Sequence, residues 1–325
     1  MTATNKINWL SVLQGWSMLL VVIGHVTLTN VFQNPETPIS AEIERIIYSF
    51  HMPLFMFISG FLFYLTKIGQ NKNYGETVWD KTKRLLIPYA AFTCATFFLK
   101  YAFNPLMKRP VDFSWSEVLD ILTFTSNPLA EMWFISTLFA LFLFFPLYKW
   151  SLGNKVRSGL LFCAAVLVYF FFPKDIELFC ISYASKYLLF FYTGILVSKY
   201  GGGKFFDNPM VLSCSAVLMV LCSLLPGMPL LNVFVGIFFS LTLCMFLSRH
   251  FPGLFGSFRE YTFQIFLMGI FFQMAIRFVY ARLGMECFYW PLYIVSILLA
   301  LYMPVLISMI IRKTGSKTLA RCFGL

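Results

Sequence analysis

Long apolar runs, each ending at a short polar segment, follow one another along all 325 residues of the chain. A helix that spans a bilayer needs about 20 predominantly apolar residues. Ten segments approach or exceed this length: 9–31, 43–66, 85–103, 131–149, 157–172, 183–199, 209–225, 230–248, 261–281 and 289–311. The pattern therefore predicts an all-α, polytopic integral membrane protein, a bundle of about ten transmembrane helices.

The remaining segments predict no second domain. Residues 113–125 include Glu117 and Asp120 and are too short to span, so we expect an amphipathic helix lying at the membrane surface. No long hydrophilic block and no repeat of fixed period occurs in the sequence. Residues 1–325 are therefore expected to form a single membrane-embedded domain.

The composition agrees with a membrane protein. Hydrophobic residues make up 59% of the chain, charged residues only 12%, and the mean hydropathy is +0.76, whereas soluble domains carry about 25% charged residues. The eight cysteines include no CxxC pair and are interpreted as small apolar side chains, so neither a disulfide framework nor a metal site is expected. The first apolar run has no small-residue cleavage pattern and is expected to be retained as a transmembrane helix.

The positions of Lys and Arg predict the orientation, because cytoplasmic loops collect basic residues. With the N-terminus inside, 17 of the 25 basic residues fall in cytoplasmic segments and seven fall outside, while Arg277 lies within a predicted span. Both termini are therefore expected in the cytoplasm, with the protein in the cytoplasmic (inner) membrane. The same distribution explains the net charge of +11 without a nucleic-acid partner.

Two of the three histidines fall inside predicted spans, where a titratable ring is costly to keep and is a candidate for function. His25 lies about six residues from the outer end of its span, roughly 9 Å, and His51 about eight residues from the outer end of the next, roughly 12 Å. The two rings are thus expected at similar depth on neighbouring antiparallel helices. Either histidine alone is equally well explained as a hydrogen-bonded packing residue, whereas two at one level favour a site.

Four stretches carry a resemblance to a known family. LQGWSMLLVVIGH (13–25) resembles the signature of the membrane acyltransferase-3 family, in which a basic residue, ten residues and then a histidine open the chain. FHMPLFMFISGFLF (50–63) is similar to the second-helix motif of its fucose 4-O-acetylase-like branch. KTKRLLIPY (81–89) and MWFISTLF (132–139) resemble motifs of the third and fourth helices. Together they cover roughly residues 9–140 in the expected order.

Two positions depart from the pattern of that family. Gln14 stands where the signature has arginine or lysine; it is expected on the same helix face as His25, about 16 Å away along the axis. Gly269, at the end of YTFQIFLMG, stands where the family often has a histidine. We expect another cation to supply the charge that Gln14 lacks, and Arg84 and Lys83 are the nearest candidates.

The resemblance implies an O-acyltransferase, usually one that moves an acetyl group from acetyl-CoA to a hydroxyl of an extracytoplasmic or lipid-linked glycan. Acetyl-CoA would be a substrate, with no permanently bound cofactor. A sugar hydroxyl needs a base to accept its proton, which suits histidine. His25 would be that base, or a covalent acyl carrier, and His51 would orient or assist it. Pro53, Ser59 and Gly60 would let the second helix bend and pack closely.

The resemblance also implies binding residues for both substrates. Donor binding is expected from four residues at the predicted cytoplasmic side: Gln14, Lys81, Lys83 and Arg84. Basic residues at that surface are equally well explained by the general excess of Lys and Arg in cytoplasmic loops and by their contact with lipid headgroups. Glu131 and Trp133 are expected to bind the acceptor, with the indole as a stacking surface; a capped helix end with an interfacial tryptophan explains this pair at least as well.

Two other function classes stay open. A glycan or small-molecule transporter would also have many spans, but transporters usually show two related halves, and residues 160–325 contain no counterpart of the histidine–proline stretch. A non-catalytic partner in envelope polysaccharide assembly is the second, because Gln14 replaces a basic residue. The partners expected of the enzyme are acetyl-CoA, a glycan or lipid-linked sugar and membrane lipids, and a homo-oligomer or a complex with an envelope-assembly protein is compatible with the sequence.

Overall fold

The computed structural model describes residues 3–26, 37–104, 110–176, 178–201, 208–224, 227–283 and 286–325. Within these ranges the regular structure is entirely helical and no residue lies in a strand, which confirms the all-α prediction. Each of the ten predicted spans contains at least one helix. Residues 27–31, the end of the first predicted span, lie outside the described residues.

By length and composition, six helical segments of the described residues are able to cross a membrane, or seven if one bent helix pair forms a single span. The six are Pro38–Ile68, Tyr74–Ala102, Leu178–Tyr200, Pro229–His250, Arg259–Leu283 and Tyr289–Thr314, and the pair is Ala130–Leu143 with Phe145–Ser151, bent by 51°. Three helices with shorter apolar stretches account for the difference from the predicted number: Lys155–Phe171, Pro209–Leu224 and the first helix, whose apolar stretch is Asn8–Gly24. The protein is thus polytopic, with several helices shorter than a full crossing needs.

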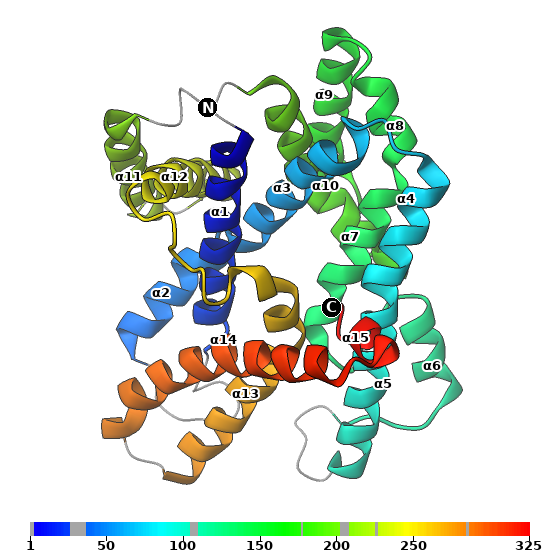
Figure 1. Ribbon diagram of the computed structural model, residues 1–325, viewed down its shortest axis with the longest axis vertical. Coiled ribbons are helices and arrows are strands. Elements are labelled where there is room, and N and C mark those ends of the chain that lie inside the picture. The colour runs from blue at the N-terminus through cyan, green and yellow to red at the C-terminus, as the bar shows by residue number, and fades with distance from the viewer. Residues whose placement is uncertain are drawn as a thin grey trace. The chain divides into compact units, whose positions relative to one another are not determined.

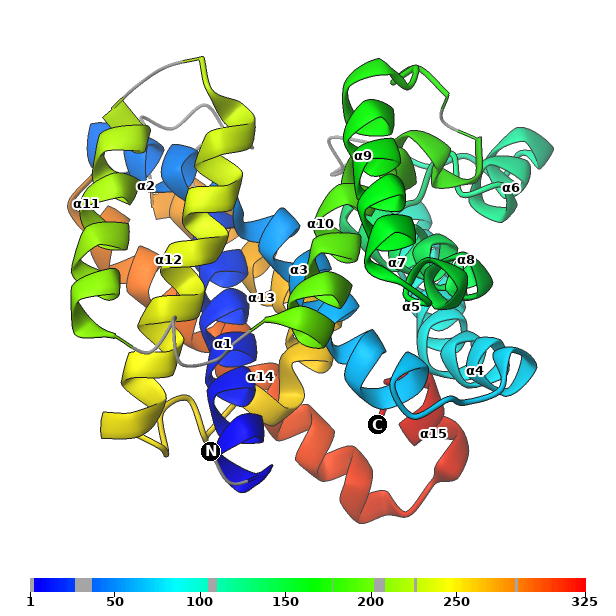
Figure 2. The same ribbon diagram turned by 90° about the horizontal axis from the view of Figure 1, so that it is seen from above.

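The helices form two compact units, and each is described by itself. The first unit comprises residues 1–55 and 202–315. Its helices are α1 (Ala3–Gly24), α2 (Pro38–Tyr48), the start of α3 (His51–Phe63), α11 (Pro209–Leu224), α12 (Pro229–His250), α13 (Thr262–Leu283) and α14 (Tyr289–Thr314). Here α1 packs against α12 and α13, and α13 packs along α14 (Figures 1 and 2). The helix α3 begins in this unit and continues into the second. The single membrane domain that the sequence predicts over residues 1–325 stays a prediction.

A buried apolar cluster joins α1, α13 and α14 in the first unit. It contains Met18, Val22, Ile265, Ala300, Leu301 and Val305. Gly269 lies where α13 meets α14, and a Cβ added to it would sit 3.1 Å from the carbonyl oxygen of Ala300. Small residues allow such close approach of membrane helices. A side chain at this position would require the backbone of α14 to shift by a few tenths of an ångström, so the contact favours glycine.

The second unit comprises residues 56–201 and 316–325. Its elements are the rest of α3, the π-helical turns η1 (Tyr64–Ile68) and η2 (Thr82–Leu86), α4 (Tyr74–Lys81), α5 (Ile87–Ala102), α6 (Trp115–Leu122), η4 (Ala130–Met132), α7 (Trp133–Leu143), α8 (Phe145–Ser151), α9 (Lys155–Phe171), η5 (Leu178–Cys180), α10 (Ile181–Tyr200) and α15 (Lys317–Cys322). In this unit α10 packs against α7 and α9 (Figure 2), and α15 packs against α5 (Figure 1).

In the second unit α3 and α10 cross with their backbones in contact. A Cβ added to Gly60 would sit 1.9 Å from the carbonyl oxygen of Phe191, and one added to Gly194 would sit 2.0 Å from that of Phe57. Neither distance leaves room for any side chain, so each glycine permits the approach of the other helix. The prediction that Gly60 allows close packing of the second span is confirmed.

The segment 113–125 contains the helix α6, as predicted. The backbone N–H of Glu117 donates to Ser114 Oγ at 3.3 Å, which caps the first turn. Trp115, Leu119 and Leu122 are exposed apolar side chains of this short helix. Its location at the membrane surface stays a prediction.

The predicted orientation has a direct test in two exposed loop residues of the second unit. In a variant without native cysteines, Ser126→Cys is expected to react with a membrane-impermeant thiol reagent in intact cells, because residues between the third and fourth spans are predicted outside. Asn71→Cys is expected to react only after permeabilisation. The reverse pattern would overturn the orientation.

Candidate functional site

The second predicted span is broken immediately before His51. The helix α2 ends at Tyr48, α3 begins at His51, and Ser49 and Phe50 form the turn between them. Pro53 explains the break, because proline offers no N–H to the carbonyl four residues earlier and its ring clashes with that carbonyl. Residues 38–68 still count as one apolar segment long enough to cross a membrane, so the bend at this proline stays a prediction. His51 therefore opens a helix within a membrane segment.

His25 follows the last residue of α1. The sequence predicted that the helix continues past His25, whereas α1 ends at Gly24 and His25 lies in a turn. Two side chains of α13 bind the final carbonyl groups: Gln273 Nε2 donates to the Val22 oxygen at 2.8 Å, and Arg277 Nη2 donates to the His25 oxygen. The backbone N–H of His25 also donates to the Val22 oxygen, at 3.3 Å. Because the last carbonyls of a helix lack their usual i+4 partners, the two side chains stabilise the end of α1 at this point.

Both imidazole rings are oriented by a carbonyl oxygen four residues earlier in the chain. His25 Nδ1 lies 2.9 Å from the Val21 oxygen, and His51 Nδ1 lies 2.9 Å from the Ile47 oxygen. Because a carbonyl oxygen only accepts hydrogen bonds, Nδ1 carries the proton in each ring, and the neutral ring keeps its lone pair on Nε2. Each ring is thus held in the tautomer that a general base needs.

The two histidines and Tyr48 form a cluster of three rings. The centroids of His25 and His51 are 6.0 Å apart with the rings nearly perpendicular, and Tyr48 lies 5.7 Å from His25 and 4.9 Å from His51. His51 is only 2% exposed, and its Nε2 has no hydrogen-bond partner among the described residues, whereas His25 is half-buried. The predicted proximity of the two histidines is confirmed, and His25 is the more exposed of the two.

Tyr48 and the two α13 side chains are members of this site that the sequence analysis did not identify. A single tyrosine at the end of a helix carries no distinguishing pattern. Gln273 and Arg277 did carry a signal, since two polar residues four apart share one face of an otherwise apolar helix.

Gln14 lies on α1, half-buried, three turns before His25. Its own carbonyl oxygen accepts a hydrogen bond from Ser17 Oγ at 2.9 Å. Because α1 is one uninterrupted helix over this interval, the expected separation of about 16 Å from the histidine applies. Gln14 is therefore not part of the three-ring cluster.

The other predicted donor-binding residues lie in the second unit, around the π-helical turn η2. Lys81 Nζ sits 3.9 Å from the centre of the Phe142 ring, a cation–π contact. Lys83 Nζ is 3.9 Å from Asp80 Oδ1. Arg84 is exposed, with no ion pair among the described residues. Of these three cations, Arg84 is the one that is exposed and has no carboxylate partner among the described residues.

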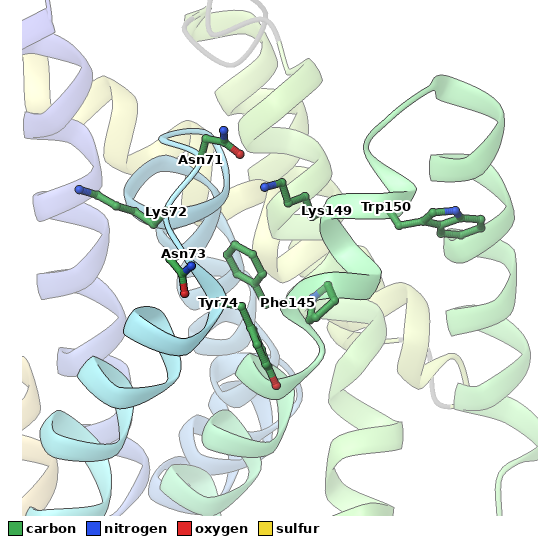
Figure 3. A pocket seen from close by; sticks show the side chains of 8 residues that line it. Asn71, Lys72, Asn73, Tyr74, Phe145, Lys149 and Trp150 are labelled. Carbon is green, nitrogen blue, oxygen red and sulfur yellow. The ribbon is translucent and has the colours of Figure 1, made fainter.

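A pocket of about 540 Å³ lies at the start of α4 and α8 in the second unit. Its lining residues are Asn71, Lys72, Asn73, Tyr74, Phe145, Pro146, Lys149 and Trp150. Figure 3 shows Lys149 pointing toward Asn71, whereas Trp150 points away from them. The lining has two lysines and no carboxylate, and its floor is the buried ring of Phe145, which packs against Tyr74 at 6.0 Å. Such a pocket suits an anion with an apolar part.

The predicted acceptor residues also lie in the second unit, at the start of α7. Glu131 is half-buried, and its Oε2 has no hydrogen-bond partner among the described residues. The Trp133 ring stacks on two tyrosines of α10, with centroids 4.8 Å from Tyr183 and 5.3 Å from Tyr187. The indole of Trp133 therefore packs within the protein. In this pair of residues, the Glu131 carboxylate is the group that can accept a further hydrogen bond.

The comparisons with known proteins agree with these observations. A family model described as an acyltransferase domain matches residues 7–311. Nodulation protein NolL of Sinorhizobium fredii (strain NBRC 101917 / NGR234) is 28% identical over 177 residues, which are 54% of this chain and 45% of that protein. NolL of Mesorhizobium japonicum (strain LMG 29417 / CECT 9101 / MAFF 303099) is 26% identical over 157 residues, 48% and 39% of the two chains. The chain thus matches less than half the length of these relatives, and no solved structure matches it.

Proposed function

This chain belongs to the membrane acyltransferase-3 family, and from that membership we propose that it is an O-acetyltransferase of the cytoplasmic membrane. The donor is acetyl-CoA, and the acceptor is a hydroxyl of an extracytoplasmic or lipid-linked glycan. One observation carries the proposal: the half-buried ring of His25, in a membrane segment, lies 6.0 Å from the ring of His51, and its Nδ1 lies 2.9 Å from the Val21 carbonyl oxygen. This contact places the lone pair of the neutral His25 ring on Nε2.

His25 acts as the general base in this proposal. Its Nε2 takes the proton of the sugar hydroxyl while the hydroxyl oxygen attacks the thioester carbonyl. The bond from carbon to sulfur then breaks, and the leaving thiolate takes up a proton. The carbonyl oxygen of Val21 orients the ring and favours the imidazolium that forms, because Nδ1–H donates to it.

His51 supports the base from within the protein. Its ring is buried, lies edge-on to His25 and is fixed by the Ile47 carbonyl. A buried ring in this place restricts the positions that the His25 ring can adopt. We therefore assign His51 a positioning role, with Tyr48 as the third wall of the cluster.

The donor phosphates are assigned to cations of the second unit that face the predicted cytoplasmic side. Arg84 is exposed and has no carboxylate partner among the described residues, and Lys72 and Lys149 line a pocket without carboxylates. Charge-assisted hydrogen bonds to phosphate are roughly twice as strong as neutral ones. On the acceptor side, the Oε2 atom of Glu131 supports hydrogen bonding to a sugar hydroxyl.

The donor assignment predicts a change in KM. Arg84→Ala and Lys149→Ala are each expected to raise the KM for acetyl-CoA about tenfold, because a lost charge-assisted hydrogen bond is worth at least about 1.4 kcal/mol. Lys83→Ala serves as the matched control and is expected to change the KM less, since its ammonium already lies near Asp80. Steady-state kinetics in membrane vesicles measures these values. Equal KM values in all four proteins would contradict the assignment.

The proposed function is tested with membrane vesicles and acetyl-CoA labelled in the acetyl group. Transfer of the label to a glycan fraction that is released by mild base is the expected result, because an O-acetyl ester is base-labile. Absence of transfer in the wild type together with transfer by Gln14→Arg would identify the chain as a non-catalytic relative. Absence in both would overturn the proposed activity.

A further inference from the structure

The end of α1 is held by one face of α13 in the first unit. Gln273 and Arg277 lie four residues apart on α13, and they donate to the Val22 and His25 carbonyl oxygens, respectively. Gln273 is 2% exposed, and Arg277 is half-buried. Both hydrogen bonds reach the turn that carries the His25 ring.

Packing reinforces the same contact. Val26, the residue after His25, is buried in a cluster with Ile276 and Tyr280 of α13 and with Tyr289 and Tyr293 of α14. Residues 273, 276, 277 and 280 share one face of α13, because they are three or four positions apart. This face therefore meets the end of α1 with two polar donors and two apolar side chains.

Electrostatics favours this arrangement. The last carbonyls of a helix carry partial negative charge and have no partner within the helix, so a cation there is stabilising. In a membrane segment no bulk water replaces a missing donor. The guanidinium of Arg277 supplies both the charge and the donor at the carbonyl of His25 itself.

We propose that Gln273 and Arg277 are positioning residues for acyl transfer: they fix the last turn of α1 and thereby place His25 Nε2 at the reacting hydroxyl. This inference rests on the proposed role of His25 as the base. The ring is tied to the Val21 oxygen, so it moves with the backbone of that turn. A displacement of about 1 Å at a reacting group lowers rates by as much as about 100-fold.

The test compares folded variants by kcat and KM separately. Arg277→Met and Gln273→Met keep the length of each side chain and remove its donors; Arg277→Lys keeps a cation that donates one hydrogen bond. Arg282→Ala is the matched control, an exposed arginine of the same helix that stacks on Phe278. We expect kcat to fall about 100-fold in Arg277→Met and about tenfold in Gln273→Met, with the KM for acetyl-CoA unchanged. Arg277→Lys is expected to recover about tenfold of the loss, and Arg282→Ala to retain full activity.

Hydrogen exchange of the intact protein measures the positioning itself. The peptide that contains the end of α1 is expected to exchange faster in Arg277→Met and Gln273→Met, while other membrane peptides and the unfolding temperature stay close to those of Arg282→Ala. If Arg277→Met fails to accumulate, Gln273→Met and Arg277→Lys are compared with Arg282→Ala in the same two measurements.

Two results separate the possible failures. An unchanged kcat in the folded Gln273 and Arg277 variants, in an enzyme that His25→Ala inactivates, would overturn the positioning inference alone. Full activity of His25→Ala would overturn the proposed base, and the positioning role would fall with it.

Discussion

Replacing His25 by alanine is expected to lower the rate of acetyl transfer by about 10²–10⁴-fold, the usual effect of losing a general base. The protein should still accumulate, because the half-buried ring contributes little to the core and the α13 hydrogen bonds reach backbone atoms that alanine retains. Transfer of labelled acetyl groups in vesicles, normalised to the amount of folded protein, measures the effect.

His250 provides a matched control for that substitution. It lies at the end of α12, where its Nδ1 is 3.0 Å from the Phe246 carbonyl oxygen, the same bond that orients His25. It is exposed and has no second histidine beside it among the described residues. His250→Ala is expected to keep full activity. If His25→Ala were as active as His250→Ala, His25 would not be the general base.

The largest expected effect on folding is that of Gly194→Leu. A Cβ at this position would sit 2.0 Å from the carbonyl oxygen of Phe57, so the backbones of α3 and α10 would have to move apart. Overpacking commonly costs about 1–3 kcal/mol, and a clash with backbone atoms, which cannot rotate away, belongs at or above the upper end. Loss of the monodisperse peak in size-exclusion chromatography, or a large fall in the unfolding temperature, is the expected result.

Gly159→Leu is the control for this prediction. Gly159 lies in α9, and an added Cβ would meet no atom within 4 Å. Leucine also has a higher helix propensity than glycine, so this variant is expected to fold normally. An unfolding temperature of Gly194→Leu equal to that of Gly159→Leu would contradict the close crossing of α3 and α10.

The helical positions were predictable because each apolar run must fold into a helix when it is surrounded by lipid. The break of the second span was also predictable, since Pro53 removes a helix hydrogen bond. The helix α4 was missed because its polar sequence resembles a loop. Asn73 gives the signal: its side chain caps the N–H groups of Gly75 and Glu76, a pattern that marks the start of a helix.

The histidine pair was predictable from its depth in two adjacent spans, and its rings do lie 6.0 Å apart. Besides Tyr48, the members of the site that were missed come from α13, more than 240 positions away along the chain, and only the folded chain brings them to α1. The end of α1 at Gly24 was missed for the same reason: the side chains that stabilise it belong to another helix. Hydropathy cannot locate a helix end that tertiary contacts determine.

Mass spectrometry of the envelope glycans measures whether the protein acetylates a glycan and whether this requires His25. Three otherwise identical strains are compared: one lacking the gene, one complemented with the wild type, and one complemented with His25→Ala. Only the wild type is expected to add the mass of one acetyl group to a glycan, and mild base is expected to remove it. The same acetylated glycan in the strain without the gene, or in the His25→Ala strain at wild-type abundance, would contradict this expectation.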